Sequence, residues 1–205
     1  MDTNPDIRAG SPDGLSHSDA RVHWSAWVAL AVLVLAAAWF RSIDKGNAAG
    51  ATLLGAAGCL ALILPPRERM RALPWRVRAF PRHLDSLPVF ATLLSAPGYG
   101  LNWFHGVNPY DEVVHLLSGA LAGVALAALV GADGRSRRID RMLRLGLAAG
   151  FAMSVVWEGF EWAVGIVGDW RDTWTDVALT TVGVVLACVL ASRPSVVRAD
   201  AGRDL

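Results

Sequence analysis

The feature that most constrains this chain is a series of long apolar stretches that carry almost no charge. A helix needs about 20 mostly apolar residues to cross the roughly 30 Å hydrocarbon core of a bilayer. Hydrophobic residues make up 54% of the chain and charged residues only 18%, whereas soluble domains carry about 25% charged residues. We therefore expect an all-α, polytopic transmembrane helix bundle. The apolar windows predict six spans, at residues 24–40, 48–64, 84–104, 113–131, 143–167 and 173–192.

The third stretch, 84–104, is the weakest of the six, because Asp85 lies at its start and Pro97 lies among glycines near its end. Proline removes a backbone donor and kinks a helix, so we expect a kinked or interrupted span. Residues 1–22 precede the first span and are too long and polar for the start of a signal peptide. We expect a disordered tail at 1–22, a membrane domain at 23–192 and a second short tail at 193–205.

Arginine and lysine are distributed very unevenly between the connections. If the six spans alternate, 16 of the 19 basic residues lie on one side and only Arg41, Lys45 and Arg171 on the other. Because basic residues mark the cytoplasmic side, both termini are expected in the cytoplasm. The basic connection 65–83, which also carries Trp75 and Phe80, either lies on anionic headgroups or is a solvated loop.

The same topology brings seven carboxylates to the outer side of the membrane, although they come from three separate stretches of sequence. They are Asp111, Glu112, Glu158, Glu161, Asp169, Asp172 and Asp176. Residues three or four apart share a helix face, as do Asp111 with His115 and Glu158 with Glu161. Some of these acids, in particular Glu112, Asp169 and Asp172, could instead be ordinary solvated residues.

Seven carboxylates cannot all ionise in a low dielectric against so few outer cations. Either several are protonated and hydrogen-bonded, or a bound cation neutralises them. Carboxylates with one imidazole suit Mg²⁺, Mn²⁺, Fe²⁺, Ca²⁺ or Zn²⁺. We take Asp111, His115, Glu161 and Asp176 as candidate metal ligands. Glu158 and Asp172 are the candidate catalytic carboxylates.

The net charge, the cysteines, a glycine pair and the absence of several known motifs further limit the possible functions. The net charge of +1 gives no reason to expect nucleic acid as a partner. Cys59 and Cys188 lie in apolar stretches, so we expect both to be buried small apolar side chains. Gly119 and Gly123 form a small-xxx-small pair that would let a neighbouring helix approach closely below His115. The sequence contains no glycine-rich phosphate loop, GxSxG or HExxH motif.

Two motifs lie in the second half of the chain. The first is Tyr-Asp-x-x-x-His-x-x-x-Gly, at Tyr110, Asp111, His115 and Gly119. The second comprises Glu158, Glu161, Trp162, Asp169, Asp172, Thr173, Asp176 and Gly183. Together they resemble the uncharacterised bacterial inner-membrane family named after YjdF, over roughly residues 84–190. The order of Asp-x-x-x-His, Glu and an Asp-rich helix is more distantly similar to VanZ-like membrane proteins. YjdF-like chains carry extra residues between Glu161 and Asp169, which leaves the geometry of that connection open.

The resemblance implies a multi-span helical protein of the bacterial cytoplasmic membrane, and it brings no established reaction, substrate or metal. Three functions remain in competition. The first is a divalent-cation site open to the outer face, which could serve a metal-dependent enzyme acting on a lipid-linked or envelope substrate. The second is a transporter or channel component that uses the acids as a proton or cation relay. The third is a non-catalytic bundle whose acids hold the spans together.

Overall fold

The computed structural model describes residues 21–104, 108–164 and 169–191, and these residues form helices and no strands. The two terminal tails predicted from the sequence lie almost wholly outside the described residues. The long helices are α1 Trp24–Ser42, α2 Gly46–Ile63, α4 Leu87–Gly100, α5 Tyr110–Gly131, α6 Ile139–Val164 and α7 Trp170–Ala191. Three short elements, η3 Arg67–Arg69, α3 Trp75–Arg78 and η4 Arg82–Ser86, lie in the connection between α2 and α4.

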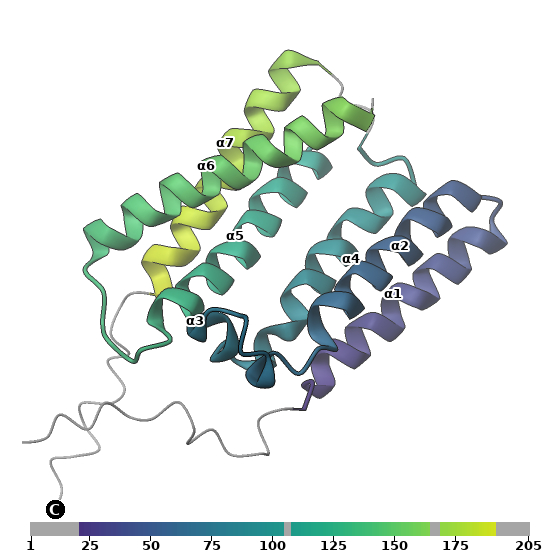
Figure 1. The fold of residues 1–205 in the computed structure, drawn as a ribbon. Helices are drawn as coiled ribbons and strands as arrows, with labels where there is room; N and C mark the ends of the chain where they lie inside the picture. The colour runs from purple at the N-terminus through teal and green to yellow at the C-terminus, as the bar shows by residue number, and fades with distance from the viewer. Residues whose placement is uncertain (1–20, 105–107, 165–168, 192–205) are drawn as a thin grey trace, which may run out of the picture.

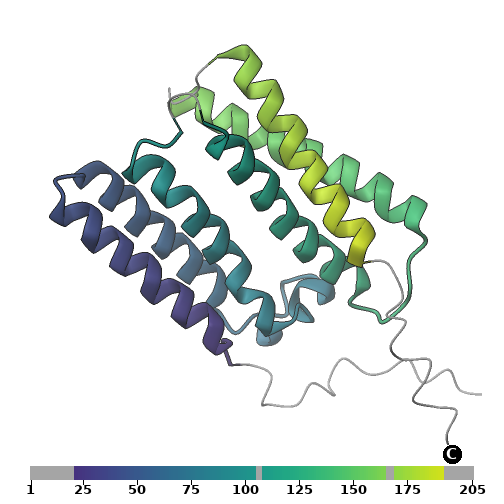
Figure 2. The same cartoon turned by 180° about the vertical axis from the view of Figure 1, so that it is seen from behind.

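The long helices form two groups that lie side by side, as Figures 1 and 2 show from opposite sides. Helices α1, α2 and α4 share one core, in which Leu33, Phe40, Ile63 and Val89 are buried. Helices α5, α6 and α7 form the other group around a smaller cluster that includes Val184. Packing of α4 against α5 joins the two groups. The all-helical prediction is therefore confirmed.

Helices α5 and α7 have the most extensive contact in the bundle, and glycines allow it. A Cβ atom at Gly119 would collide with the backbone carbonyl of Thr180, and one at Gly183 would collide with the carbonyl of Leu116. A Cβ atom at Gly123 would come 2.5 Å from the carbonyl oxygen of Val184. The close approach predicted from Gly119 and Gly123 is confirmed, and Gly183 supplies the matching small residue on α7.

Four of the helices, α1, α2, α5 and α7, are long and apolar enough to cross a membrane. Helix α4 has only 14 residues, which at about 1.5 Å per residue is roughly 21 Å and shorter than a hydrocarbon core. It is shorter than the predicted stretch 84–104 because η4 occupies its start and the helix ends at Gly100, soon after Pro97. Helix α6 is long, but it carries both arginines and glutamates. The number of six spans stays a prediction.

Two arginines of the basic connection are buried. They are therefore neither solvated nor available to anionic headgroups, the two environments expected for this connection. Arg82 forms a bidentate ion pair with Glu68 at 2.6 and 2.7 Å and lies 3.2 Å from Asp85, which Arg67 also approaches at 2.7 Å. Arg82 also donates to the carbonyl of Ile63 at the end of α2. Buried charges need partners, so these two arginines fold the connection onto the helix ends instead of binding headgroups.

The protonation of Glu68 reflects this network. Burial opposes ionisation, but the hydrogen bond and charge of Arg82 outweigh it, so the pKa of Glu68 is lowered from its ordinary value. Arg76 makes a second attachment, donating to the carbonyls of Leu129 and Val130 at the end of α5 and pairing with Asp133 at 2.9 Å. The connection between α2 and α4 thus closes one end of the bundle.

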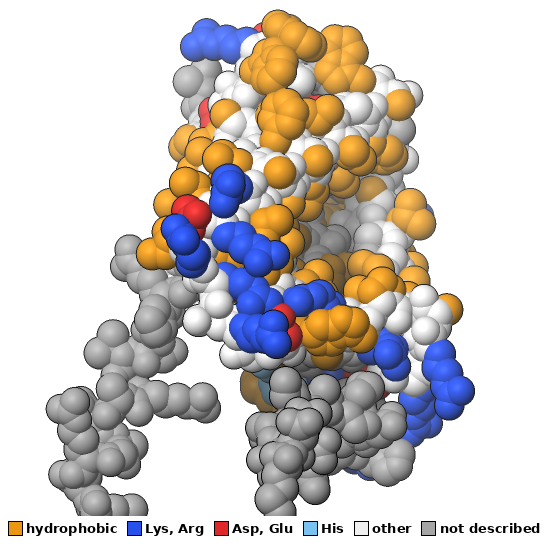
Figure 3. All heavy atoms as spheres, turned by 60° about the vertical axis from the view of Figure 1, so that its left-hand side comes forward, with side chains coloured by type: hydrophobic (Ala, Val, Ile, Leu, Met, Phe, Trp, Pro, Cys, Tyr) orange, Lys and Arg blue, Asp and Glu red, His pale blue; other side chains and the backbone are white. Residues whose placement is uncertain are grey.

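Other arginines near that end are exposed. Figure 3 shows blue side chains gathered towards one end of the visible face, next to a region of hydrophobic side chains. The exposed arginines at this end are Arg21, Arg69, Arg71, Arg135, Arg138, Arg141 and Arg144. The acids of the sequence prediction lie near the other end, where α4 and α6 finish and α5 and α7 begin. The exposed arginines and the acids therefore lie towards opposite ends of the bundle.

Candidate functional site

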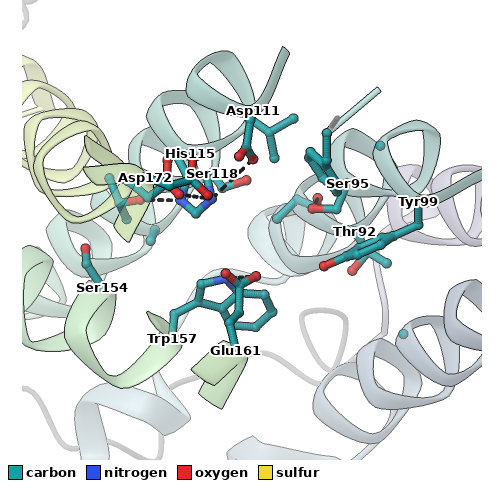
Figure 4. A pocket seen from close by; sticks show the side chains of 18 of the residues that line it. Thr92, Ser95, Tyr99, Asp111, His115, Ser118, Ser154, Trp157, Glu161 and Asp172 are labelled. Carbon is teal, nitrogen blue, oxygen red and sulfur yellow. Dashed lines mark hydrogen bonds and ion pairs between the residues drawn. The ribbon is translucent and has the colours of Figure 1, made fainter. Parts of the chain in front are cut away.

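A cavity of about 940 Å³ lies between the two groups of helices. Five helices line it: α2 and α4 from one group, and α5, α6 and α7 from the other. Figure 4 shows the polar side chains approaching one another across this space. The ionisable residues that line the cavity are Tyr99, Asp111, His115, Glu161, Asp172 and Asp176.

Asp111, His115 and Asp176 form the tightest group in the cavity. One ligand atom of each lies within 4.8 Å of the other two. His115 Nε2 is 3.5 Å from Asp111 Oδ1, one helical turn away on α5, and 3.6 Å from Asp176 Oδ2 on α7. Asp176 is only 3% exposed. The shared face of Asp111 and His115 was predicted from their spacing, and Asp176, also predicted as a ligand, meets them from α7.

Thr180 orients the imidazole from behind. Its Oγ1 lies 3.1 Å from His115 Nδ1, and the threonine is buried. This contact depends on the close approach of α5 and α7, because Gly119 on α5 lies directly against the Thr180 backbone. When Nδ1 donates its hydrogen to Thr180, Nε2 keeps a lone pair directed at the two aspartates.

Glu161 and Tyr99 approach the same space from the other walls, as Figure 4 shows. Glu161 lies on α6 and accepts a hydrogen bond of 2.9 Å from the indole Nε1 of Trp157. Tyr99 lies on α4 and interacts electrostatically with Glu161 and Asp111. Glu161 was predicted as a metal ligand, but it lies outside the group of three that Asp111, His115 and Asp176 form.

Glu158 occupies a separate position. It is 4% exposed, and its carboxyl group interacts with the hydroxyl of Thr173 on α7, which also accepts a hydrogen bond of 3.1 Å from Trp162 Nε1. Glu158 is not among the residues that line the cavity. This predicted catalytic carboxylate therefore sits behind the wall, where it joins α6 to α7.

The remaining acids divide between the cavity and ordinary structural positions. Asp172 lines the cavity from the first turn of α7. Asp169 caps that helix, since its Oδ1 accepts hydrogen bonds from the backbone N–H groups of Arg171 and Asp172 at 2.8 and 2.9 Å. Glu112 is exposed and does not line the cavity. The sequence had left solvated positions open for Glu112, Asp169 and Asp172. The structure places Glu112 and Asp169 outside the cavity and Asp172 on its wall.

Sequence reasoning missed two tyrosines that shape the site. Tyr99 carried no signal beyond its position near the end of an apolar stretch. Tyr110 stood in the quoted motif without a role, and its hydroxyl donates a 2.5 Å hydrogen bond to the carbonyl of Leu94 on α4. That bond fixes the start of α5, and with it Asp111, against the neighbouring helix.

The donor set of Asp111, His115 and Asp176 fits a divalent cation. Two ligand atoms about 2.1 Å from one ion at a tetrahedral angle are roughly 3.4 Å apart. The two measured separations from His115 Nε2, 3.5 and 3.6 Å, are close to that value. Two carboxylates and an imidazole leave coordination positions for water or a substrate oxygen.

The comparisons with known proteins identify the family without adding an activity. No curated protein and no solved structure matches the chain. A family profile described as "Predicted membrane protein (DUF2238)" matches residues 23–195, which include all six long helices. The match covers most of the chain and agrees with the four membrane-capable helices. The chain therefore belongs to this family of predicted membrane proteins.

Proposed function

We propose that this membrane protein holds a divalent cation between Asp111, His115 and Asp176, at the end of the bundle that faces away from the cytoplasm. The observation that carries the proposal is the convergence of three ligand atoms from α5 and α7 within 4.8 Å. Thr180 supports it, because metal-bound histidines characteristically hold their second ring nitrogen in a hydrogen bond. The outward orientation rests on the uneven distribution of arginine.

The chemistry that fits this site best is metal-assisted hydrolysis or group transfer on a lipid-linked or envelope substrate. A divalent ion lowers the pKa of bound water and polarises a substrate oxygen. Asp172 and Glu161 line the same cavity but do not belong to the group formed by Asp111, His115 and Asp176. Either carboxylate could therefore accept a proton from the bound water. Glu158 serves as a positioning residue, because it contacts Thr173 and does not line the cavity.

The metal content of the purified protein tests this function. Wild type should carry a stoichiometric divalent ion after chelator-free purification, or regain one when Mn²⁺ or Zn²⁺ is titrated back. Asp176→Asn removes a charged ligand and should lower bound metal sharply. Glu112→Gln is the matched control, since Glu112 is exposed and adjacent to Asp111, and it should bind like wild type.

Thermal unfolding gives the second measurement. A ligand that binds only the folded state raises stability by mass action, so added metal should raise the Tm of wild type and of Glu112→Gln but not of Asp176→Asn. If the acids are instead protonated and hydrogen-bonded, the asparagine variant should be at least as stable as wild type. That result, together with wild type that binds no metal on titration, would overturn the proposal.

A further inference from the structure

The cavity is polar at one end and apolar at the other. The acids and His115 lie near the starts of α5 and α7, whereas Ala91, Ala122 and Met153 line the part that reaches into the bundle. From Asp111 to Ala122 the cavity follows α5 for about 16 Å, at about 1.5 Å per residue. With its volume of about 940 Å³, it is large enough for a ligand with an extended apolar part.

Three hydroxyl groups that line the cavity are already satisfied by their own helices. Thr92 donates to the carbonyl of Pro88 at 2.9 Å, Ser95 to that of Ala91 at 3.2 Å and Ser154 to that of Gly150 at 2.7 Å. A hydroxyl bonded to the carbonyl four residues earlier makes little demand on a ligand. Apart from the hydroxyl of Ser118, the inner wall therefore presents methyl, methylene and small side chains that suit a hydrocarbon chain.

Two helices that line opposite sides of the cavity, α4 and α6, do not pack extensively against each other in the described part of the chain. Helix α4 packs against α1, α2 and α5, whereas α6 packs against α7 and α5. Among the described residues, α4 and α6 share no extensive contact, yet Thr92 of α4 and Trp157 of α6 both line the cavity. In a bilayer, a chain could pass between these helices without crossing water.

The charge of the residues that line the cavity indicates which kind of lipid headgroup it would favour. Four carboxylates line the cavity, at Asp111, Glu161, Asp172 and Asp176, and the described lining contains no lysine or arginine. A divalent ion on Asp111 and Asp176 offsets two of these charges and leaves Glu161 and Asp172 uncompensated. Trp157 and Tyr99 line the same part. Carboxylates beside aromatic rings attract an ammonium group and disfavour a purely anionic one.

We propose that the cavity binds a lipid whose headgroup carries an amine, with an acyl chain in the inner part and the amine beside Glu161, which leaves Asp172 to accept a proton. The inference rests on the proposed function, because the bound ion is what offsets Asp111 and Asp176. The headgroup then lies next to the ion, and its phosphate oxygens can reach the open coordination positions.

Photo-cross-linking in bilayer vesicles tests the proposal. The probe is a diacyl phosphatidylethanolamine with a diazirine in one acyl chain, and mass spectrometry maps the labelled peptides. We expect labels on α4, α5 and α6 at residues that line the cavity. Unlabelled phosphatidylethanolamine should compete about tenfold better than phosphatidylglycerol or phosphatidic acid with the same chains. Phosphoethanolamine, which has the headgroup but no chain, should not compete at similar concentrations.

Two variants test occupancy of the cavity and the headgroup preference. Ala51→Leu narrows the cavity in the second turn of α2 and should reduce cavity labelling about tenfold. Ala57→Leu is its matched control, because Ala57 is also exposed on α2 but does not line the cavity. Glu161→Gln should remove the preference for phosphatidylethanolamine over phosphatidylglycerol while labelling persists.

Equal competition by the three lipids, equal competition by phosphoethanolamine, or labels unaffected by Ala51→Leu would each overturn the inference. Mn²⁺ binding, measured on the same samples, keeps the two proposals apart. Mn²⁺ binding without headgroup selectivity would contradict the lipid inference alone. Selective lipid labelling in a wild-type protein that binds no added metal would contradict the proposed metal site and leave the amine-bearing lipid as its ligand.

Discussion

His115 of α5 and Asp176 of α7 lie 3.6 Å apart, measured from Nε2 to Oδ2, one helical turn from the close contact of Gly119 with Thr180. Neither residue could form the site within its own helix. The separation depends on glycines at the helix crossing, on Thr180 behind the imidazole and on the attachment of α5 to α4 through Tyr110. Each of these supports can be tested by a single substitution.

Thr180→Val should weaken metal binding while leaving all three ligands in place. Valine has a similar shape but cannot accept the hydrogen of His115 Nδ1, so the imidazole loses the contact that orients it. Loss of such a partner lowers metal affinity by about 10–100-fold. Titration with Mn²⁺ measures the change. Thr175→Val is the control, because Thr175 is exposed and its hydroxyl bonds only to the carbonyl of Arg171; equal losses in both variants would argue against the role of Thr180.

Gly119→Ala should force α5 and α7 apart. The added methyl group would meet backbone atoms of Thr180, which cannot move aside as a flexible side chain can. Overpacking of this kind costs about 1–3 kcal/mol, measurable as a lower free energy of unfolding in mixed micelles. Gly58→Ala on α2 meets nothing within 4 Å and should be neutral or slightly stabilising. A stable Gly119→Ala protein with unchanged metal affinity would show that the close crossing is unnecessary.

Arg82→Gln should destabilise the protein strongly, because Glu68 and Asp85 would remain as buried acids with fewer partners. Removing one partner of a buried ion pair costs about 3–5 kcal/mol. Arg144→Gln removes a charge from an exposed pair with Asp140 and should change stability by less than about 1 kcal/mol. Thermal unfolding of the two variants gives the comparison, and similar Tm values would contradict the structural role of Arg82.

Glu68→Gln should lower stability in a pH-dependent way. The lowered pKa of Glu68 means that its ionised form stabilises the fold at pH values above its ordinary pKa of 4.5. As pH falls below 4.5 and through the lower folded-state pKa, the wild type loses this contribution. The difference in Tm between wild type and variant should therefore be full at pH 7 and shrink in acid. A difference that grows towards low pH would have the wrong sign.

Reporter fusions test the orientation on which the outward site depends. Alkaline phosphatase fused after Asn108, just before the acidic start of α5, should be active because it is exported. A fusion after Gly134, in the connection between α5 and α6, should be inactive because basic residues retain that side in the cytoplasm. The reverse pattern would place the cavity's acidic end in the cytoplasm.

The periodicity and composition of the chain were sufficient to predict the helices and the shared face of Asp111 and His115. Apolar length determines which segments can cross a bilayer, and the helical repeat determines which neighbours in sequence share a face. The spacing of Gly119 and Gly123 also predicted a close helix contact. These properties depend only on residues that are close together in the sequence, so they can be predicted without the tertiary structure.

Tertiary structure alone decided which acids meet. Glu161 and Glu158 look equivalent in sequence, yet Glu161 faces the cavity while Glu158 lies behind its wall against Thr173. Asp169 caps α7, whereas Asp176 on the same helix joins His115. Arg67 and Arg82 looked like surface charges and are buried with Glu68 and Asp85. The rotation of each helix about its axis and its choice of neighbours depend on packing between distant segments, which no local pattern specifies.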